Sequence, residues 1–128
     1  MKLLIAGSRS ISDYDLIDFS IKRSGYVHDI IEIVSGSTRG VDRLGEVWAN
    51  NRGIIVTQFI PDWASQGKKA GILRNIEMVK YADAAVIIWD GESRGTKHTI
   101  DAINAARLPA YICSYIKLNQ GEYKHVKV

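Results

Sequence analysis

The chain has 128 residues and carries 17 Lys and Arg against 14 Asp and Glu, giving a formal net charge of +3 at pH 7. This length suits one domain with a single hydrophobic core. Hydrophobic and charged fractions of 46% and 24% are ordinary for a globular protein. The composition therefore argues against a disordered chain, and the mild charge argues against a dedicated binder of duplex nucleic acid.

Targeting and redox signals are few. The N-terminal apolar run is interrupted at Gly7, too early for a signal-peptide core or a membrane span, so we expect no membrane association. The single cysteine, Cys113, cannot form an intrachain disulfide. A reducing cytoplasm is the expected compartment, with Cys113 as a small buried hydrophobe.

Short apolar runs predict the strands of the fold. They lack a regular alternation of polar and apolar residues, which is typical of parallel strands covered on both faces. The runs span residues 2–6, 30–34, 54–59, 84–89 and 110–115.

Segments with helical spacing of apolar residues lie between these runs. The spaced residues are Tyr14, Ile17 and Ile21; Val41, Leu44, Val47 and Trp48; Ile72, Ile76 and Val79; and Ile100, Ile103 and Ala106. The alternation predicts an α/β fold, a Rossmann-like three-layer α/β/α domain with a mostly parallel five-stranded sheet in the order 3-2-1-4-5. We expect one domain over residues 1–128, whose tail at 117–128 either forms a short edge hairpin or frays.

Ligands of open α/β sheets bind beyond the carboxyl ends of the strands, where loops converge and helix N-termini present free N–H groups. The loops that follow the predicted strands hold most of the unusual residues of this chain. The candidate ligand-binding residues in them are Gly7, Ser8, Arg9, Ser35, Gly36, Ser37, Arg39, Gly40, Trp63, Asp90, Ser93, Gly95 and Thr96.

Two of these loops, residues 35–40 and 91–96, combine glycines with hydroxyl side chains before a helix. Such loops let backbone N–H groups approach an anion closely. Neither loop matches the P-loop or the dinucleotide fingerprint. Cationic side chains collect in the same regions, namely Arg9, Arg39, Arg43, Lys68, Lys69, Arg74, Arg94 and Lys97. Since arginine suits bidentate phosphate contacts, we expect a phosphate-bearing ligand.

Asp42 and Glu46 lie four residues apart at the start of the second predicted helix and are expected to share a helix face. They are candidates to bind ribose hydroxyls or to act as a catalytic acid/base pair. A structural alternative is that Asp42 favours the helix N-terminus and Glu46 is a solvated helix residue. Trp63, beside Asp62 in a polar loop, is the candidate for stacking on a base, or else a lid over the core.

No metal site and no cofactor are predicted. His28, His98 and His125 do not have the spacing of metal ligands, and no cysteine accompanies them. Serine-nucleophile chemistry is likewise not predicted.

Several linked motifs resemble those of a known family. They are GSRxxxD at 7–13, SGxxRGVDxLxExWA at 35–49, PDW at 61–63, GKxAGxxRNxxM at 67–78 and WDGxSxGTxxxI at 89–100. Their order and spacing resemble the YspA-type branch of the SLOG superfamily, which also contains the LOG phosphoribohydrolases and the DNA-processing protein DprA/Smf.

The resemblance implies a Rossmann-like fold that binds nucleotides or nucleotide-derived signals, with both glycine loops and the segment Arg74-Asn75 lining the site. Enzyme-like members carry a glutamate in the motif PGGxGTxxE, and Thr99 stands at the matching position here. LOG-type hydrolysis would then need a different carboxylate, for which Asp42, Glu46, Asp90 and Glu92 are the candidates.

Three functions remain open from the sequence. The first is a sensor or sequestering module for a nucleotide-derived small molecule, and the second is an N-glycosidic hydrolase of nucleoside phosphates. The third is DprA-like binding of single-stranded DNA along the basic edge, for which Trp63 is the one obvious stacking residue. The likeness to dimeric LOG proteins also implies a homodimer.

Overall fold

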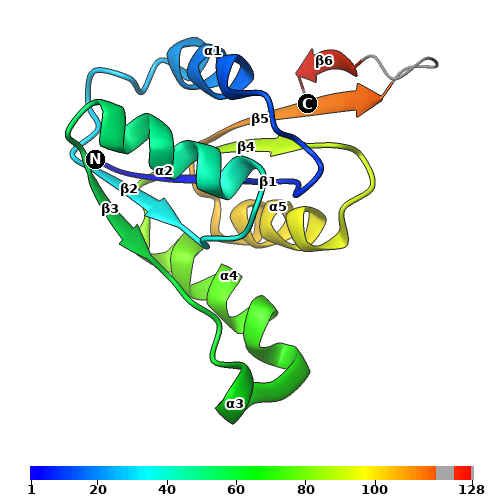
Figure 1. Cartoon of the computed structure of the whole chain (residues 1–128). Helices are drawn as coiled ribbons and strands as arrows, with labels where there is room; N and C mark the ends of the chain where they lie inside the picture. The colour runs from blue at the N-terminus through cyan, green and yellow to red at the C-terminus, as the bar shows by residue number, and fades with distance from the viewer. Residues whose placement is uncertain (118–122, 128) are drawn as a thin grey trace.

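The computed structural model describes residues 1–117 and 123–127 of the chain (Figure 1). Within this part, the strands form one sheet in the order β3-β2-β1-β4-β5-β6. They are β1 (Lys2–Gly7), β2 (Glu32–Ser35), β3 (Ile55–Gln58), β4 (Ala84–Trp89), β5 (Ala110–Lys117) and β6 (Tyr123–Lys127). Strands β1 to β5 are parallel and β6 is antiparallel to β5.

The predicted Rossmann-like fold and the order of the first five strands are therefore confirmed. The predicted edge hairpin is present as the pairing of β5 with β6. Asn119, Gln120 and Gly121, which connect the two strands in the sequence, lie outside the described residues.

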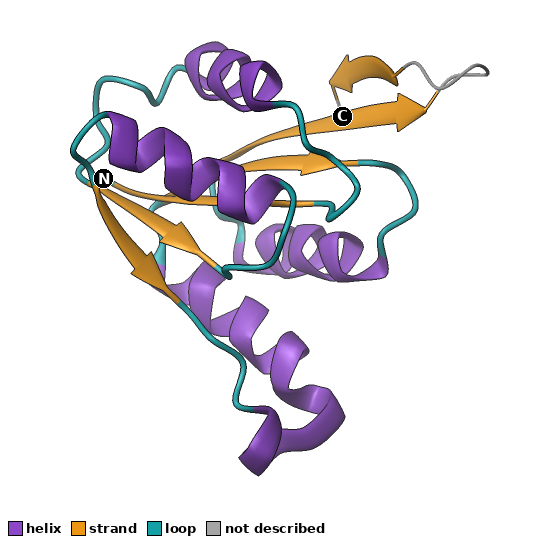
Figure 2. Cartoon of the chain, viewed as in Figure 1, coloured by secondary structure: helices purple, strands orange, loops and turns teal. Residues whose placement is uncertain are grey.

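Helices cover both faces of the sheet (Figure 2). They are α1 (Tyr14–Ser24), α2 (Val41–Asn51), α3 (Trp63–Gln66), α4 (Ala70–Tyr81) and α5 (Arg94–Ala106), with a 3₁₀ turn η1 (Gly67–Lys69) between α3 and α4. Helices α1 and α2 pack on one face and α4 and α5 on the other. The chain changes face between β1 and β4, so the carboxyl ends of these strands form the topological switch point at which ligands of this fold bind.

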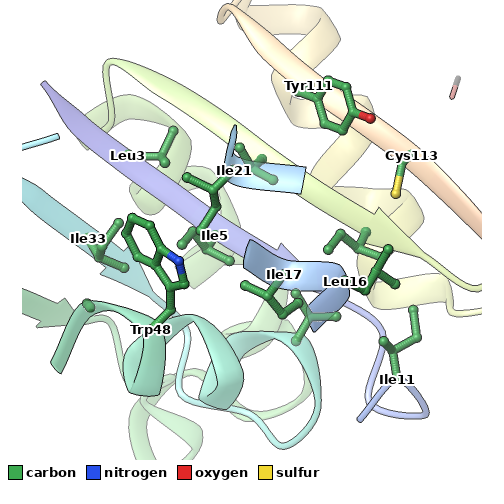
Figure 3. Packing of buried hydrophobic residues seen from close by; sticks show 14 of the residues in the cluster. Leu3, Ile5, Ile11, Leu16, Ile17, Ile21, Ile33, Trp48, Tyr111 and Cys113 are labelled. Atoms are coloured by element: carbon green, nitrogen blue, oxygen red, sulfur yellow. The ribbon is translucent and has the colours of Figure 1, made fainter. Parts of the chain in front are cut away.

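The larger core lies under α1 and α2. Trp48 of α2 is fully buried there against residues of the sheet such as Ile5 and Ile33 (Figure 3). Its indole Nε1 donates a hydrogen bond to Asp18 Oδ1 at 2.9 Å. Cys113 is fully buried in the same cluster, as expected for a small hydrophobe.

The bounds of β1, β2, β3 and β5 differ from the sequence-based prediction by one or two residues. Strand β2 begins at Glu32, not at residue 30, because the chain is still turning there and the Ile31 side chain is 70% exposed. Residues 63–69, expected to be loop, form α3 and η1. The Asp62 carboxylate accepts the Ser65 N–H at 3.1 Å and so caps α3.

No helix in the described part of the chain is both long and apolar enough to cross a membrane.

Candidate functional site

Ser8 holds together the loops at the switch point. It is fully buried, and its Oγ accepts the N–H of Asp90 at 2.9 Å. Its carbonyl oxygen accepts the N–H of Val41, the first residue of α2, at 3.3 Å. Ser8 therefore fixes the loops after β1 and β4 and the start of α2 relative to one another.

Gly40 allows α2 to begin this close to the first loop. Its φ is +81°, a left-handed conformation, and an added Cβ would lie 2.4 Å from the Ser8 carbonyl oxygen. A larger residue here would have to push the two loops apart.

Asp90 shapes the loop that leads into α5. Its Oδ1 accepts the N–H groups of Glu92 and Ser93 at 2.9 and 2.8 Å, and its Oδ2 accepts the Ser10 hydroxyl at 2.7 Å. Partial burial acts to raise the pKa of this carboxyl, but the hydrogen bonds to Ser10, Ser93 and Glu92 together outweigh it and lower the pKa below the ordinary 3.8.

We expect Asp90→Ala to lower the free energy of unfolding by about 2 kcal/mol at pH 7, because two backbone N–H groups lose their acceptor. A carboxyl whose pKa is depressed by folding stabilises the fold above its unfolded pKa and loses this effect as pH falls through the folded pKa. The difference between Asp90→Ala and the wild type should therefore shrink as urea melts are taken from pH 7 to about pH 3. A difference independent of pH would contradict this role of the ionised carboxylate.

A small cavity of about 70 Å³, here called the inner pocket, lies at the switch point. Its walls come from β1 and the loop after it, from the glycine loops at 35–40 and 91–96, and from helices α2, α4 and α5. They comprise Ala6, Gly7, Arg9, Thr38, Asp42, Arg74, Asn75, Met78, Ser93, Gly95, Thr96 and Thr99.

Asp42 is the carboxylate of the inner pocket and is only 4% exposed. Its Oδ1 accepts the Gly7 N–H at 3.2 Å, and its Oδ2 accepts the Thr38 hydroxyl at 2.8 Å. Burial raises the pKa of Asp42, and the hydrogen bonds from Thr38 and Gly7 and the nearby Arg74 guanidinium oppose the rise without cancelling it. The pocket thus contains a buried carboxyl with an altered affinity for protons, a feature typical of binding and catalytic sites.

Arg74 of α4 reaches across the sheet edge beside Asp42. Its Nη1 donates to the carbonyl oxygens of Gly36 and Phe59 at 2.7 and 3.2 Å, and its Nε donates to Asn75 Oδ1 at 2.9 Å. A Cβ added at Gly36 would lie 2.8 Å from this Nη1 and 2.9 Å from Asp42 Oδ2. Glycine at position 36 is what leaves room for the guanidinium and the carboxylate side by side.

A wider hollow of about 580 Å³, here called the outer groove, opens beside the inner pocket. The two share walls at Arg9, Thr38, Arg74, Asn75 and Gly95. The remaining groove residues are Gly36, Ser37, Arg43, Ile60, Pro61, Trp63, Lys68, Gly71, Ile72, Arg94 and His98. Five of the described residues that line this groove are arginine or lysine, and none of them is Asp or Glu. The groove therefore attracts anions.

The N-terminus of α5 borders both hollows. Ser93 caps this helix by accepting the Thr96 N–H at 3.4 Å, whereas the N–H groups of Arg94 and Gly95 precede the first hydrogen bond of the helix. These two N–H groups and the positive end of the helix dipole add to the attraction for an anion.

The structure brings many of the predicted site residues together in the walls of the two hollows. These are Gly7, Arg9, Gly36, Ser37, Asp42, Trp63, Arg74, Asn75, Ser93, Gly95 and Thr96. Ser8, Gly40 and Asp90 instead shape the loops, as described above, and Arg39 is exposed and outside both sets of walls.

Glu46 and Ser35 also lie behind the walls. Glu46 is 8% exposed, so the alternative of a solvated helix residue was wrong. Its Oε2 accepts the hydroxyls of Ser35 and Ser37 at 2.7 and 2.6 Å, and its Oε1 accepts Gln58 Nε2 at 3.2 Å. Because Ser37 lines the outer groove, Glu46 supports that wall from behind.

Sequence reasoning did not select Thr38 or His98. Thr38 belongs to the hydroxyl-rich loop and could have been found as a neighbour of Ser37. His98 follows Arg94 by four residues on α5, a spacing that places both on one helix face. Among the described residues, no group of three or more His, Cys, Asp or Glu is arranged to hold a metal ion.

Comparison with known proteins agrees with this architecture. Residues 1–65 match the model of the family described as "YspA, cpYpsA-related SLOG family". The chain belongs to this family. It is also 36% identical over 118 residues to the Gene 61 protein of Mycobacterium phage D29, an alignment that covers 84% of this chain and 92% of the phage protein. No solved structure matches the chain significantly.

The residues matched to the SLOG family model extend from β1 to the start of α3. They include Arg9, Gly36 and Asp42, but the α4 and α5 walls of the site lie beyond the match. Membership in the family, which the motifs indicate, is therefore confirmed. The assignment of ligand-binding residues stays a prediction.

Proposed function

We propose that this SLOG protein binds a phosphate-bearing nucleotide or a nucleotide-derived small molecule at the switch point, as a sensor or sequestering module. The observation that carries the proposal is the division of charge in the site. Cationic side chains without a carboxylate line the described outer groove, whereas a buried carboxylate lies in the inner pocket.

The separation of the cationic groove from the buried carboxylate gives the ligand a defined orientation. Phosphates lie in the outer groove, near Arg9, Arg94 and the free N–H groups of α5. Asp42 accepts hydrogen bonds from a sugar or base at the inner pocket, since an ionised carboxylate would repel a phosphate there. Trp63, 56% exposed at the groove wall, is available to stack on the base.

The same carboxyl supports a second function, N-glycosidic hydrolysis of a nucleoside phosphate. In this reaction a carboxyl group near the sugar assists the attack of water on an oxocarbenium-like ribose. Asp42 has the burial and the raised pKa that suit such a role. Glu46 lies behind the wall, held by Ser35, Ser37 and Gln58, so Asp42 is the stronger catalytic candidate.

The proposal is tested by mixing the protein with nucleoside mono-, di- and triphosphates, ADP-ribose, NAD and cyclic nucleotides. The melting temperature of the protein and the amount of released base are measured in the same samples. A ligand that binds only the native state raises its melting temperature. Stabilisation without base release supports the binding module. Base release that Asp42→Asn abolishes supports the hydrolase, and no response to any compound contradicts both.

A matched pair of charge changes on α5 tests the assigned position of the phosphates. Arg94 lies at the N-terminal end of this helix in the groove wall, and Arg107 is its exposed C-terminal cap. We expect Arg94→Gln to weaken nucleotide binding about tenfold, the value of one charge-assisted hydrogen bond. Arg107→Gln removes the same charge and should leave the dissociation constant, measured by calorimetry, unchanged. Equal effects of the two changes would indicate only a general attraction by net charge.

A further inference from the structure

His98 occupies a distinctive place on α5. With Arg94 and Gly95 it lines the outer groove, and it also borders an apolar hollow of about 370 Å³ between α4 and α5. Ile76, Val79 and Ala102 contribute to that second hollow. His98 therefore lies between an apolar hollow and the cationic groove.

The two ring nitrogens differ in their surroundings. His98 Nδ1 is buried and has no hydrogen-bond partner among the described residues. A buried N–H without an acceptor is costly, and a neutral imidazole carries its proton on only one nitrogen. The proton is thus favoured on Nε2, which leaves Nδ1 as the unpaired buried acceptor.

We propose that His98 is a ligand-contacting residue of the outer groove that donates a hydrogen bond from Nε2–H to an anionic oxygen of the bound molecule. The proposal rests on the nucleotide-binding function inferred above. It adds a hydrogen-bond donor with a fixed direction to a groove whose positive charge comes from arginine and lysine side chains. Such a donor selects for the position of the anionic oxygen and not only for the charge of the ligand.

Two amide substitutions distinguish the nitrogens. The side-chain nitrogen of glutamine reaches the position of Nε2, and that of asparagine reaches the position of Nδ1. The probes are ADP and inorganic pyrophosphate, titrated by calorimetry into wild type, His98→Gln and His98→Asn. We expect His98→Gln to bind within about threefold of wild type and His98→Asn to bind about tenfold more weakly.

The ring itself supplies a second measurement that does not depend on the variants. Nitrogen-15 spectra of the wild-type imidazole should show the Nε2–H tautomer in the free protein, and the Nε2 signal should shift when ADP is added. An Nδ1–H tautomer, or an Nε2 signal insensitive to bound ADP, would overturn the proposal even if His98→Asn failed to fold.

The outcomes separate this proposal from the one on which it rests. Binding by wild type with unchanged affinity in His98→Asn overturns the role of His98 alone. Equal losses of affinity in His98→Gln and His98→Asn would mean that His98 only fills space between α4 and α5, which also overturns the proposal. Failure of wild type to bind ADP, pyrophosphate and every other compound of the nucleotide panel overturns the nucleotide-binding function and this role together.

Discussion

Arg74→Met should reduce nucleotide affinity at least about a hundredfold and lower the free energy of unfolding by about 3 kcal/mol. The guanidinium lines both hollows and donates to two carbonyl oxygens, those of Gly36 and Phe59. Its loss leaves both oxygens without this donor and removes the cation whose charge favours the ionised form of buried Asp42. Methionine keeps a similar length of apolar side chain but restores neither effect. Calorimetry gives the affinity and urea melts the stability.

A double substitution separates the two effects. Loss of Arg74 leaves the buried carboxylate of Asp42 without its neighbouring positive charge. We therefore expect the two changes to be coupled, so that Arg74→Met lowers the free energy of unfolding less in an Asp42→Asn background than in wild type. Ligand binding is measured well below the melting temperature of each variant, with circular dichroism to verify folding. A folded Arg74→Met variant that binds as tightly as wild type would exclude Arg74 from the ligand site.

Gly7→Ala, at the carboxyl end of β1, should lower the free energy of unfolding by about 3 kcal/mol or more and the melting temperature by roughly 10 °C. An added Cβ would lie 2.1 Å from the carbonyl oxygen of Ile88 and 2.8 Å from the side chain of Val41. Neither atom can yield cheaply, because Ile88 is the residue of β4 paired with Gly7 and Val41 is fully buried at the start of α2.

Gly95→Ala is the matched control, since the same methyl group meets nothing within 4 Å. Gly95 lies inside α5, where alanine is favoured over glycine by about 0.5–1 kcal/mol. The variant should therefore melt slightly higher than wild type, as calorimetric scans can measure. It should also bind ligand more weakly, because the methyl group enters space beside the free N–H groups of the site. A similar loss of stability in both variants would show that the close contacts at Gly7 are not the cause.

The sequence predicts the sheet well because β1, β2 and β4 are short, largely apolar runs that are buried on both faces. The expectation of burial on both faces was wrong for β3, which lies at the edge of the sheet and leaves Ile55 70% exposed. The rules of chain connection then leave few alternatives for the strand order. Helices α3 and η1 were not predicted because elements of four and three residues are too short to show a helical period. The start of β2 was misplaced because Ile31 has strand propensity but no neighbour that buries it.

The loops that form the site were predictable from their glycines, hydroxyls and arginines, but the direction of each side chain was not. Ser8 and Ser37 belong to similar loops, and only tertiary packing buries Ser8 completely while Ser37 reaches the outer groove. Glu46 likewise has the sequence context of a surface helix residue. Its burial follows from contacts with Ser35 and Gln58 on two different strands, which no local pattern encodes.

The residues that line the outer groove differ in how firmly the rest of the molecule holds them. Arg9, Gly36 and Arg94 belong to loops and a helix fixed by the sheet, whereas Trp63 and Lys68 belong to α3 and η1, which have no buried residue and pack mainly on each other and on α4 (Figure 1). Substitutions in residues 63–69 should therefore carry little penalty in folding free energy. This wall of the outer groove can therefore change in shape and polarity at little cost to the sheet that fixes the other walls.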